Sequence, residues 1–76
     1  MQIVMTTETQ EIEFDGARLA GLREERGFSQ AEVARTIGIK PQSLCGIEKN
    51  KHNPSAVTLM KICLLFNVKP QDFVRS

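Results

Sequence analysis

Apolar residues recur every three or four positions along most of the chain, which is the spacing that buries one face of an α-helix. The spacing breaks at intervals, and each break contains a glycine, a proline or a residue that caps helices. Together these features predict short helices at residues 16–26, 30–37, 41–49, 56–66 and 70–74. Five short helices with brief connections and no central strand predict a compact all-α bundle.

The boundaries of the central pair of helices are marked by specific residues. Ser29 and Glu32 have the spacing of a capping box, in which each side chain binds a free backbone N–H at a helix start. Gly38 ends that helix, and Pro41 stands in the first turn of the next one, where proline is tolerated. The tight turn between them forces the second helix across the first and leaves one of its sides free. This arrangement is a helix-turn-helix, whose second helix fits the major groove of DNA.

Residues 1–14 have the least clear pattern. The pieces QIVM and EIEF favour a strand, but polar residues separate them, so a short strand and a disordered arm are both open. Phe14 is expected to pack on the helices, and Asp15 is expected to cap the first helix. The chain is accordingly divided into an acidic N-terminal arm at 1–14 and a helical domain at 15–76.

The formal net charge of +1 hides an uneven distribution. Residues 1–15 carry four acidic side chains and no basic one, whereas residues 16–76 carry all ten Lys and Arg against five acidic residues. A mildly basic body is compatible with a DNA partner, but many proteins without a polyanionic partner carry as much positive charge. Charge alone therefore does not select a function.

The chain has few groups suited to catalysis or metal binding. Cys45 and Cys63 share a single histidine, His52, which makes a poor set of metal ligands, and both are expected to be free thiols. The sequence contains no set of nucleophile, base and orienting group and no phosphate loop, so we expect no enzyme activity, cofactor or metal. No apolar run approaches the ~20 residues that span a bilayer, and the first residues lack a signal-peptide pattern. A cytoplasmic location is expected.

Three stretches in a fixed order resemble the Xre/Cro-type (lambda-repressor-like) helix-turn-helix domains. They are LREERGFSQAEVARTIGI, GIEKNKHNPS and TLMKICLLFNV, and the resemblance covers the chain from about Leu19 to Phe73. It implies a five-helix DNA-binding domain in which residues 41–49 are the recognition helix. Double-stranded DNA is then the expected partner.

The resemblance also implies a role for each residue on the expected DNA face. Gln30 matches a glutamine that binds a DNA phosphate, and Gln42 is the strongest reader of bases because its amide both donates and accepts. Lys40 is expected to reach a guanine or a phosphate. Pro41 and Gly46 stand where some relatives use glutamine, so DNA shape is expected to contribute to recognition. The expected DNA-binding residues are Gln30, Lys40, Pro41, Gln42, Ser43, Gly46, Lys49, Lys51 and His52.

Residues at the end of the recognition helix and beyond it have expected roles as well. Lys49, Lys51 and His52 are expected to hold phosphates, although His52 taken alone also fits an ordinary surface histidine. Arg23 and Glu48 match a family ion pair that ties the first helix to the end of the recognition helix.

Met60 and Leu64 lie four residues apart on the fourth helix, away from its expected core side. Such a pair either marks a dimer surface or completes a small core, and both interpretations are open. A homodimer is expected in either case, because helix-turn-helix proteins commonly read two half-sites about 34 Å apart.

The leading interpretation is a sequence-specific transcriptional regulator, expected to be a repressor, that acts as a dimer on a palindromic operator. The alternative is a protein-interaction module or antitoxin-like component whose main partner is another protein. Salt dependence separates the two, because DNA binding releases counterions and an apolar protein interface does not.

Overall fold

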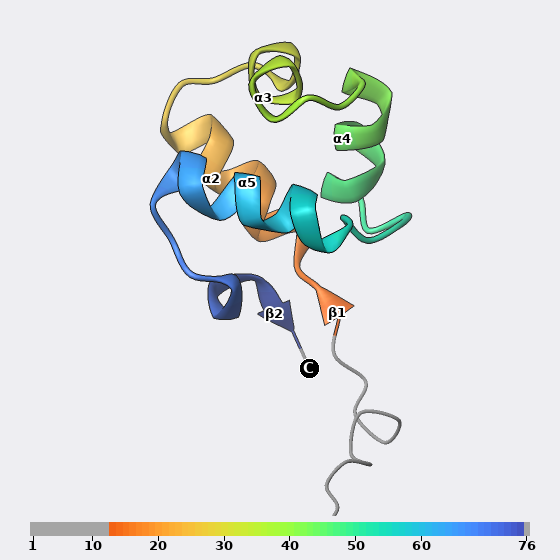
Figure 1. Cartoon of the computed structure of the whole chain (residues 1–76), viewed down its shortest axis with the longest axis vertical. Helices are drawn as coiled ribbons and strands as arrows, with labels where there is room; N and C mark the ends of the chain where they lie inside the picture. The colour runs from red at the N-terminus through yellow and green to blue at the C-terminus, as the bar shows by residue number, and fades with distance from the viewer. Residues whose placement is uncertain (1–12, 76) are drawn as a thin grey trace, which may run out of the picture.

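The computed structural model describes residues 13–75, and its elements follow one another as shown in Figure 1. They are the strand β1 (Glu13–Phe14), the helices α2 (Gly16–Glu25), α3 (Gln30–Ile37), α4 (Pro41–Glu48) and α5 (Ala56–Phe66), the 3-10 helix η1 (Pro70–Phe73) and the strand β2 (Val74–Arg75).

The predicted all-α class is confirmed, but residues 13–75 contain four α-helices rather than five. The segment predicted as a helix at 70–74 is instead a four-residue 3-10 helix that ends at Phe73. Val74 leaves the helical conformation, with φ −88° and ψ 130°, because it pairs as a strand with Phe14. The fifth predicted helix is therefore corrected to a short turn followed by a strand.

Two predicted helices end one residue early. The helices predicted at 16–26 and 41–49 stop before their last residues, Arg26 and Lys49. These residues have φ of −88° and −94° with ψ of 0° and 8°, at the edge of the helical region. Each of them caps its helix rather than extending it.

β1 and β2 form a small antiparallel ladder, with Glu13 opposite Arg75 and Phe14 opposite Val74. Glu13 and Phe14, the last two residues of the predicted N-terminal arm, form a strand, while residues 1–12 lie outside the described part. The partner strand was not predicted, because the pairing joins opposite ends of the chain and no local pattern reveals it.

The ladder is held to the helices by its aromatic residues. The rings of Phe14 and Phe73 stack with their centroids 5.1 Å apart, and the N–H of Asp15 donates to the carbonyl of Phe73 at 2.7 Å. The Asp15 carboxylate also accepts a hydrogen bond from Arg18 N at 3.1 Å, so Asp15 caps α2 as predicted.

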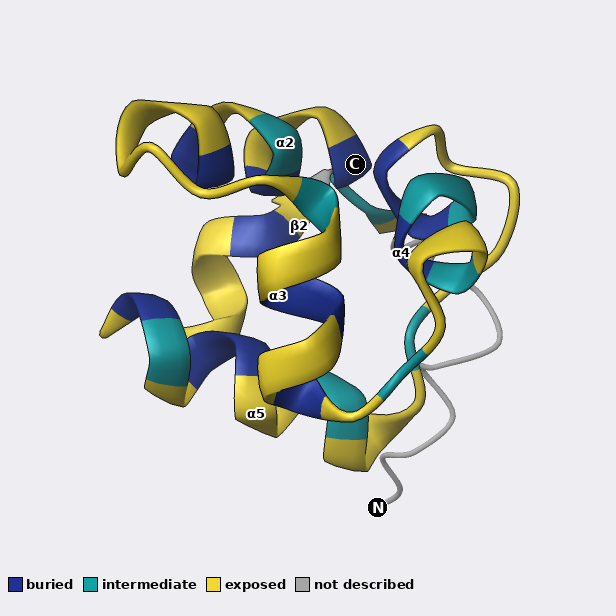
Figure 2. Cartoon of the chain, turned by 90° about the horizontal axis from the view of Figure 1, so that it is seen from above, coloured by how far each residue is buried: buried dark blue, intermediate teal, exposed yellow. Residues whose placement is uncertain are grey.

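One core fills the space between the helices, and Figure 2 shows the buried residues on the sides of the helices that face one another. α3 packs against both α4 and α5, and α2 packs against α4. The core residues are Leu19, Leu22, Val33, Ala34, Ile37, Leu44, Ile47, Ile62, Cys63, Phe66 and Phe73.

Cys45 and Cys63 are both free thiols. Burial raises the pKa of the Cys63 thiol, and the negative charge of Asp72 raises it further, so this side chain packs as a neutral group. Between Glu13 and Arg75, no helix is long and apolar enough to cross a membrane, and no group of His, Cys, Asp and Glu side chains is arranged to hold a metal ion.

Candidate DNA-binding interface

The turn between α3 and α4 places α4 at the edge of the domain (Figure 1). α3 ends at Gly38, whose φ of 79° lies in the left-handed region that favours glycine. The N–H of Gly38 donates to Arg35 O at 3.3 Å, and the N–H of Ile39 donates to Ala34 O at 2.9 Å. Ile39 packs against the core, so the chain changes direction sharply before α4 begins at Pro41.

α4 has a buried face and an open face (Figure 2). Leu44, Ile47 and Glu48 are buried. At about 100° per residue, Gln42 and Lys49 point in the opposite direction, with Gly46 between them along the helix. The outward residues are the exposed Lys40, Pro41, Gln42 and Lys49 and the half-buried Ser43 and Gly46.

Arg23 of α2 and Glu48 of α4 form a buried, two-pronged ion pair. Arg23 Nε donates to Glu48 Oε2 at 2.7 Å, and Nη2 donates to Oε1 at 3.2 Å. Arg23 Nη1 donates to the carbonyl of Phe28 at 2.8 Å, so all three guanidinium nitrogens have partners. The hydrogen bond to Glu48 raises the pKa of Arg23 in spite of its burial, so Arg23 remains charged.

Gln30 joins the same network at the start of α3. Its Nε2 donates to Glu48 Oε1 at 2.9 Å, and this is the only hydrogen bond of the amide within residues 13–75. One amide N–H and the amide oxygen are therefore left for another partner. Gln30 was predicted to contact a phosphate, but its hydrogen bond to Glu48 of α4, which orients the side chain, was not predicted.

Gly16, the first residue of α2, meets the end of α4 at close range. It is buried, and a Cβ atom there would lie 2.6 Å from the carbonyl oxygen of Glu48 and even closer to that of Ile47. Only glycine fits such a contact without a shift of the backbone. The carbonyl end of α4 thus faces the N–H end of α2, which is the favourable orientation of two helix dipoles.

Asn50 fixes the start of the loop that follows α4. Its φ is 61°, and its Oδ1 accepts a hydrogen bond from Gly16 N at 2.9 Å. The next N–H, that of Lys51, donates to Gly46 O at 2.8 Å and closes the end of the helix. Neither of these roles, that of Gly16 and that of Asn50, was predicted from the sequence. An asparagine just after a helix was a signal for a left-handed residue, whereas a contact across 34 positions leaves no local signal.

The loop brings His52 back over α4. Lys49, Lys51 and His52 are all exposed. The imidazole of His52 lies against Gly46, because a Cβ atom on Gly46 would be 2.5 Å from His52 Nε2. Gly46 is therefore half-buried although it lies on the outward side of α4.

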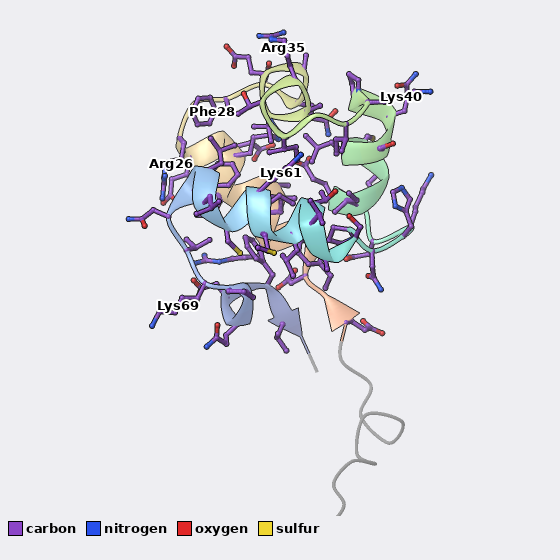
Figure 3. All side chains as sticks on the ribbon, viewed as in Figure 1. Arg26, Phe28, Arg35, Lys40, Lys61 and Lys69 are labelled. Carbon is purple, nitrogen blue, oxygen red and sulfur yellow. The ribbon has the colours of Figure 1, made fainter. Side chains whose placement is uncertain are left out.

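Basic side chains are spread over several sides of the domain (Figure 3). Lys40 points outward at the start of α4, whereas Arg26 and Lys69 project from the opposite side of the domain in this view. Arg26 has its own partner there, since its Nη2 donates to Phe66 O at 3.1 Å. The local lysines beside α4, rather than the total charge, are what make its outward side suited to a polyanion.

Met60 and Leu64 lie on the outer side of α5 and are 61% and 80% exposed, so they do not complete the core. Val57 precedes Met60 by one helical turn and is 60% exposed. These three residues form an apolar stripe. Val57 was not predicted to belong to it, although it has the same helical spacing. A hollow of about 350 Å³ adjoins the stripe and is lined by Thr36, Ile37, Lys61, Leu64 and Leu65.

The sequence model of a family described as a helix-turn-helix domain matches residues 16–75, the part of the chain that holds α3, α4 and the network behind them. This chain belongs to the Xre/Cro-type helix-turn-helix family. Its sequence is 37% identical over 51 residues to the HTH-type transcriptional regulator YgzD of Bacillus subtilis, covering 67% of this chain and 77% of YgzD.

Two solved structures extend the comparison to the fold of Xre-type proteins. The restriction-modification controller protein C.AhdI from Aeromonas hydrophila has a TM-score of 0.69 and 30% identity, covering 75% of this chain and 86% of that one. The biofilm regulator SinR of Bacillus subtilis, solved in complex with DNA, has a TM-score of 0.68 and 33% identity, covering 75% and 95%. The prediction of a DNA-binding regulator rather than an enzyme is confirmed at the level of the family.

Proposed function

We propose that this chain binds one duplex DNA sequence as a homodimer on a palindromic operator, with α4 in the major groove, and represses transcription there. The observation that carries the proposal is that α4 has one buried face, which packs against the domain, and one face open to solvent. The major groove admits an α-helix presented in this way. The SinR complex with DNA supports DNA as the partner. We propose the cytoplasm as the compartment, because the relatives described above come from bacteria, whose DNA lies there.

The outward residues of α4 have complementary roles in the proposed complex. Gln42 reads an adenine edge, because its amide can donate to N7 and accept from the N6 amino group. Lys40 donates to a guanine edge or to a phosphate, and Ser43 holds the DNA backbone. Pro41 offers only an apolar surface, which suits the methyl group of thymine. With so few reading groups, the shape of the DNA contributes to sequence preference.

Phosphate contacts flank α4 on both sides. Gln30 offers its remaining amide N–H at the start of α3, next to the positive end of that helix. Lys49 and Lys51 are exposed at the other side of α4. These contacts orient α4 on the duplex and supply the salt-dependent part of the affinity.

Replacing Gln42 with alanine is expected to relax preference at one base pair of each half-site by about 1–3 kcal/mol, because a bidentate contact is lost. Replacing Lys49 with alanine is the matched control. It is expected to weaken binding to all sequences alike and to reduce by about one the slope of log affinity against log salt concentration. Both variants are measured by fluorescence anisotropy on the operator and on its single-base variants. Uniform weakening by the Gln42 variant would contradict the assignment of this residue to a base.

The apolar stripe of Val57, Met60 and Leu64 is the proposed dimer surface. Replacing Leu64 with glutamate is expected to raise the dimer dissociation constant by at least about 10-fold, because burying a leucine contributes about 1.5–3 kcal/mol. Gln71→Glu adds the same charge at an exposed residue of η1 and serves as the control. Sedimentation equilibrium measures both. A dimer unaffected by Leu64→Glu would place the interface elsewhere.

The function itself is tested by selecting bound sequences from a pool of random duplexes. We expect enrichment of a palindrome with half-sites about 34 Å, or one helical turn, apart, and an affinity that falls steeply between 50 and 200 mM salt, by roughly a thousandfold for about six phosphate contacts. A pool that shows no enrichment would refute the proposal.

A second candidate function is a protein-interaction module whose main partner is another protein. The apolar stripe favours it, because three large side chains at helical spacing are exposed on one side of α5. Such a partner would bind through the stripe with an affinity that barely changes with salt. Two results together would favour this alternative: the wild type enriches no DNA sequence, and Leu64→Glu no longer binds the partner protein.

A further inference from the structure

The glycine at position 46 is not explained by its own backbone. Among residues 13–75, only Gly27 and Gly38 are glycines with positive φ, and Gly46 lies inside α4 with a helical conformation. Glycine is a poor helix former, so the interior of an eight-residue helix is an unfavourable place for it. The reason for a glycine at this position is a neighbouring side chain that occupies the space beside Gly46.

That group is the imidazole of His52. A Cβ atom added to Gly46 would lie 2.5 Å from His52 Nε2, 2.9 Å from Cδ2 and 3.5 Å from Cε1. Each of these atoms belongs to the same ring, so the imidazole occupies the direction in which a side chain at position 46 would leave the helix.

This position lies on the open side of α4. Gly46 follows Gln42 by four residues and precedes Lys49 by three, so the three residues share one face of the helix. His52 is exposed while it rests on that face. The imidazole thus lies on the same face of α4 as Gln42, in the space that a side chain at position 46 would take.

The loop that carries His52 is fixed at its start. Asn50 Oδ1 accepts a hydrogen bond from Gly16 N at 2.9 Å, and Lys51 N donates to Gly46 O at 2.8 Å. Two hydrogen bonds, to α2 and to α4, hold the two residues before His52. A group that reads DNA benefits from such a preset position, because less conformational freedom is lost on binding.

We propose that His52 fills the side-chain position left vacant by Gly46 and reads a purine edge in the major groove, beside the base pair contacted by Gln42. The inference rests on the proposed function, since it assigns a further reading residue to the same face of α4. The imidazole N–H is the donor, and N7 of the purine is the acceptor. His52 is thereby a residue of sequence specificity and not only a phosphate contact.

The test compares base preferences of the wild type and two variants, all selected from the same pool of random duplexes. His52→Ala is expected to lose preference for a purine at one base pair of each half-site by about 2- to 13-fold, the range for one hydrogen bond, with the other positions unchanged. Lys51→Ala is the control from the same loop, and it is expected to weaken every sequence alike.

Gly46→Ala provides a second, independent variant. Its methyl group takes the space of the imidazole, so we expect this variant to lose sequence preference at the same base pair as His52→Ala. The melting temperature is expected not to fall, since alanine is a good helix former. In the His52→Ala background, Gly46→Ala is expected to cause no further loss, because both changes remove one interaction. Replacing the purine with its 7-deaza analogue is expected to weaken the wild type and leave His52→Ala unaffected.

The outcomes separate this inference from the function on which it rests. If the wild type enriches no sequence, both are overturned. If the wild type enriches a site but His52→Ala weakens all sequences alike, only the inference is overturned and His52 is a phosphate contact. Loss of sequence preference at one base pair in both His52→Ala and Gly46→Ala supports the assignment of His52 to a base.

Discussion

Replacing Glu48 with alanine is expected to destabilise the domain by about 3–5 kcal/mol, the usual cost of removing one partner of a buried ion pair. The side chains of Arg23 and Glu48 are only 11% and 4% exposed, so the change leaves a buried guanidinium without its buried counter-charge. It also removes the acceptor of Gln30. A domain of this size is stable by about 4–11 kcal/mol, so a large part of the total is lost. Urea denaturation followed by circular dichroism measures the effect.

Glu24 supplies a control on the same arginine. Its carboxylate lies 3.6 Å from Arg23 Nη2, but its side chain is 70% exposed. An exposed ion pair contributes about 0–1 kcal/mol, so Glu24→Ala is expected to change the stability little. If Glu24→Ala and Glu48→Ala lowered the free energy of unfolding equally, burial would not decide the strength of the ion pair, and this prediction would be wrong.

Replacing Gly16 with alanine is the second change with a large expected effect. The new Cβ atom would lie 2.6 Å from the carbonyl oxygen of Glu48, and both α2 and α4 are fixed by the core, so one of them must shift. Overpacking of this kind costs about 1–3 kcal/mol. The same shift moves α4 and the loop that begins at Asn50, so DNA affinity is expected to fall further than the stability alone explains.

Gly21→Ala is the matched control for Gly16→Ala. Both glycines are in α2, but a Cβ atom at Gly21 meets nothing within 4 Å. Alanine in an open helix position is expected to raise the stability by about 0.5–1 kcal/mol and leave DNA binding unchanged. Thermal melting and anisotropy on the selected operator measure both variants. A Gly16→Ala protein as stable as Gly21→Ala would refute the close contact between α2 and α4.

The sequence predicted features that depend on local chemistry. The capping box is present as predicted, with Glu32 N donating to Ser29 Oγ at 3.0 Å and Ser29 N donating to Glu32 Oε1 at 2.8 Å. Asn67 ends α5 in the left-handed conformation, with φ 57°, which asparagine adopts more readily than most residues. Helix ends are set by a few neighbouring groups, so a single sequence reveals them.

Several features that depend on contacts between separate elements were not predicted. The 3-10 helix at Pro70–Phe73 is short because the chain then turns to pair with β1 from the other end of the sequence. The space at Gly46 is taken by a ring from the following loop, and the position of Gln30 depends on Glu48. Each of these outcomes is decided by packing between elements, which spacing along the chain does not encode.

Whether the outward face of α4 reads DNA is tested by following the backbone amide chemical shifts while the protein is titrated with the selected operator duplex. We expect the largest changes between Lys40 and His52 and at Gln30. The amides of Val57, Met60 and Leu64 are expected to change only as far as dimer formation changes. Changes confined to α5, with the amides of Gln42 and Lys49 unaffected, would contradict DNA reading by α4.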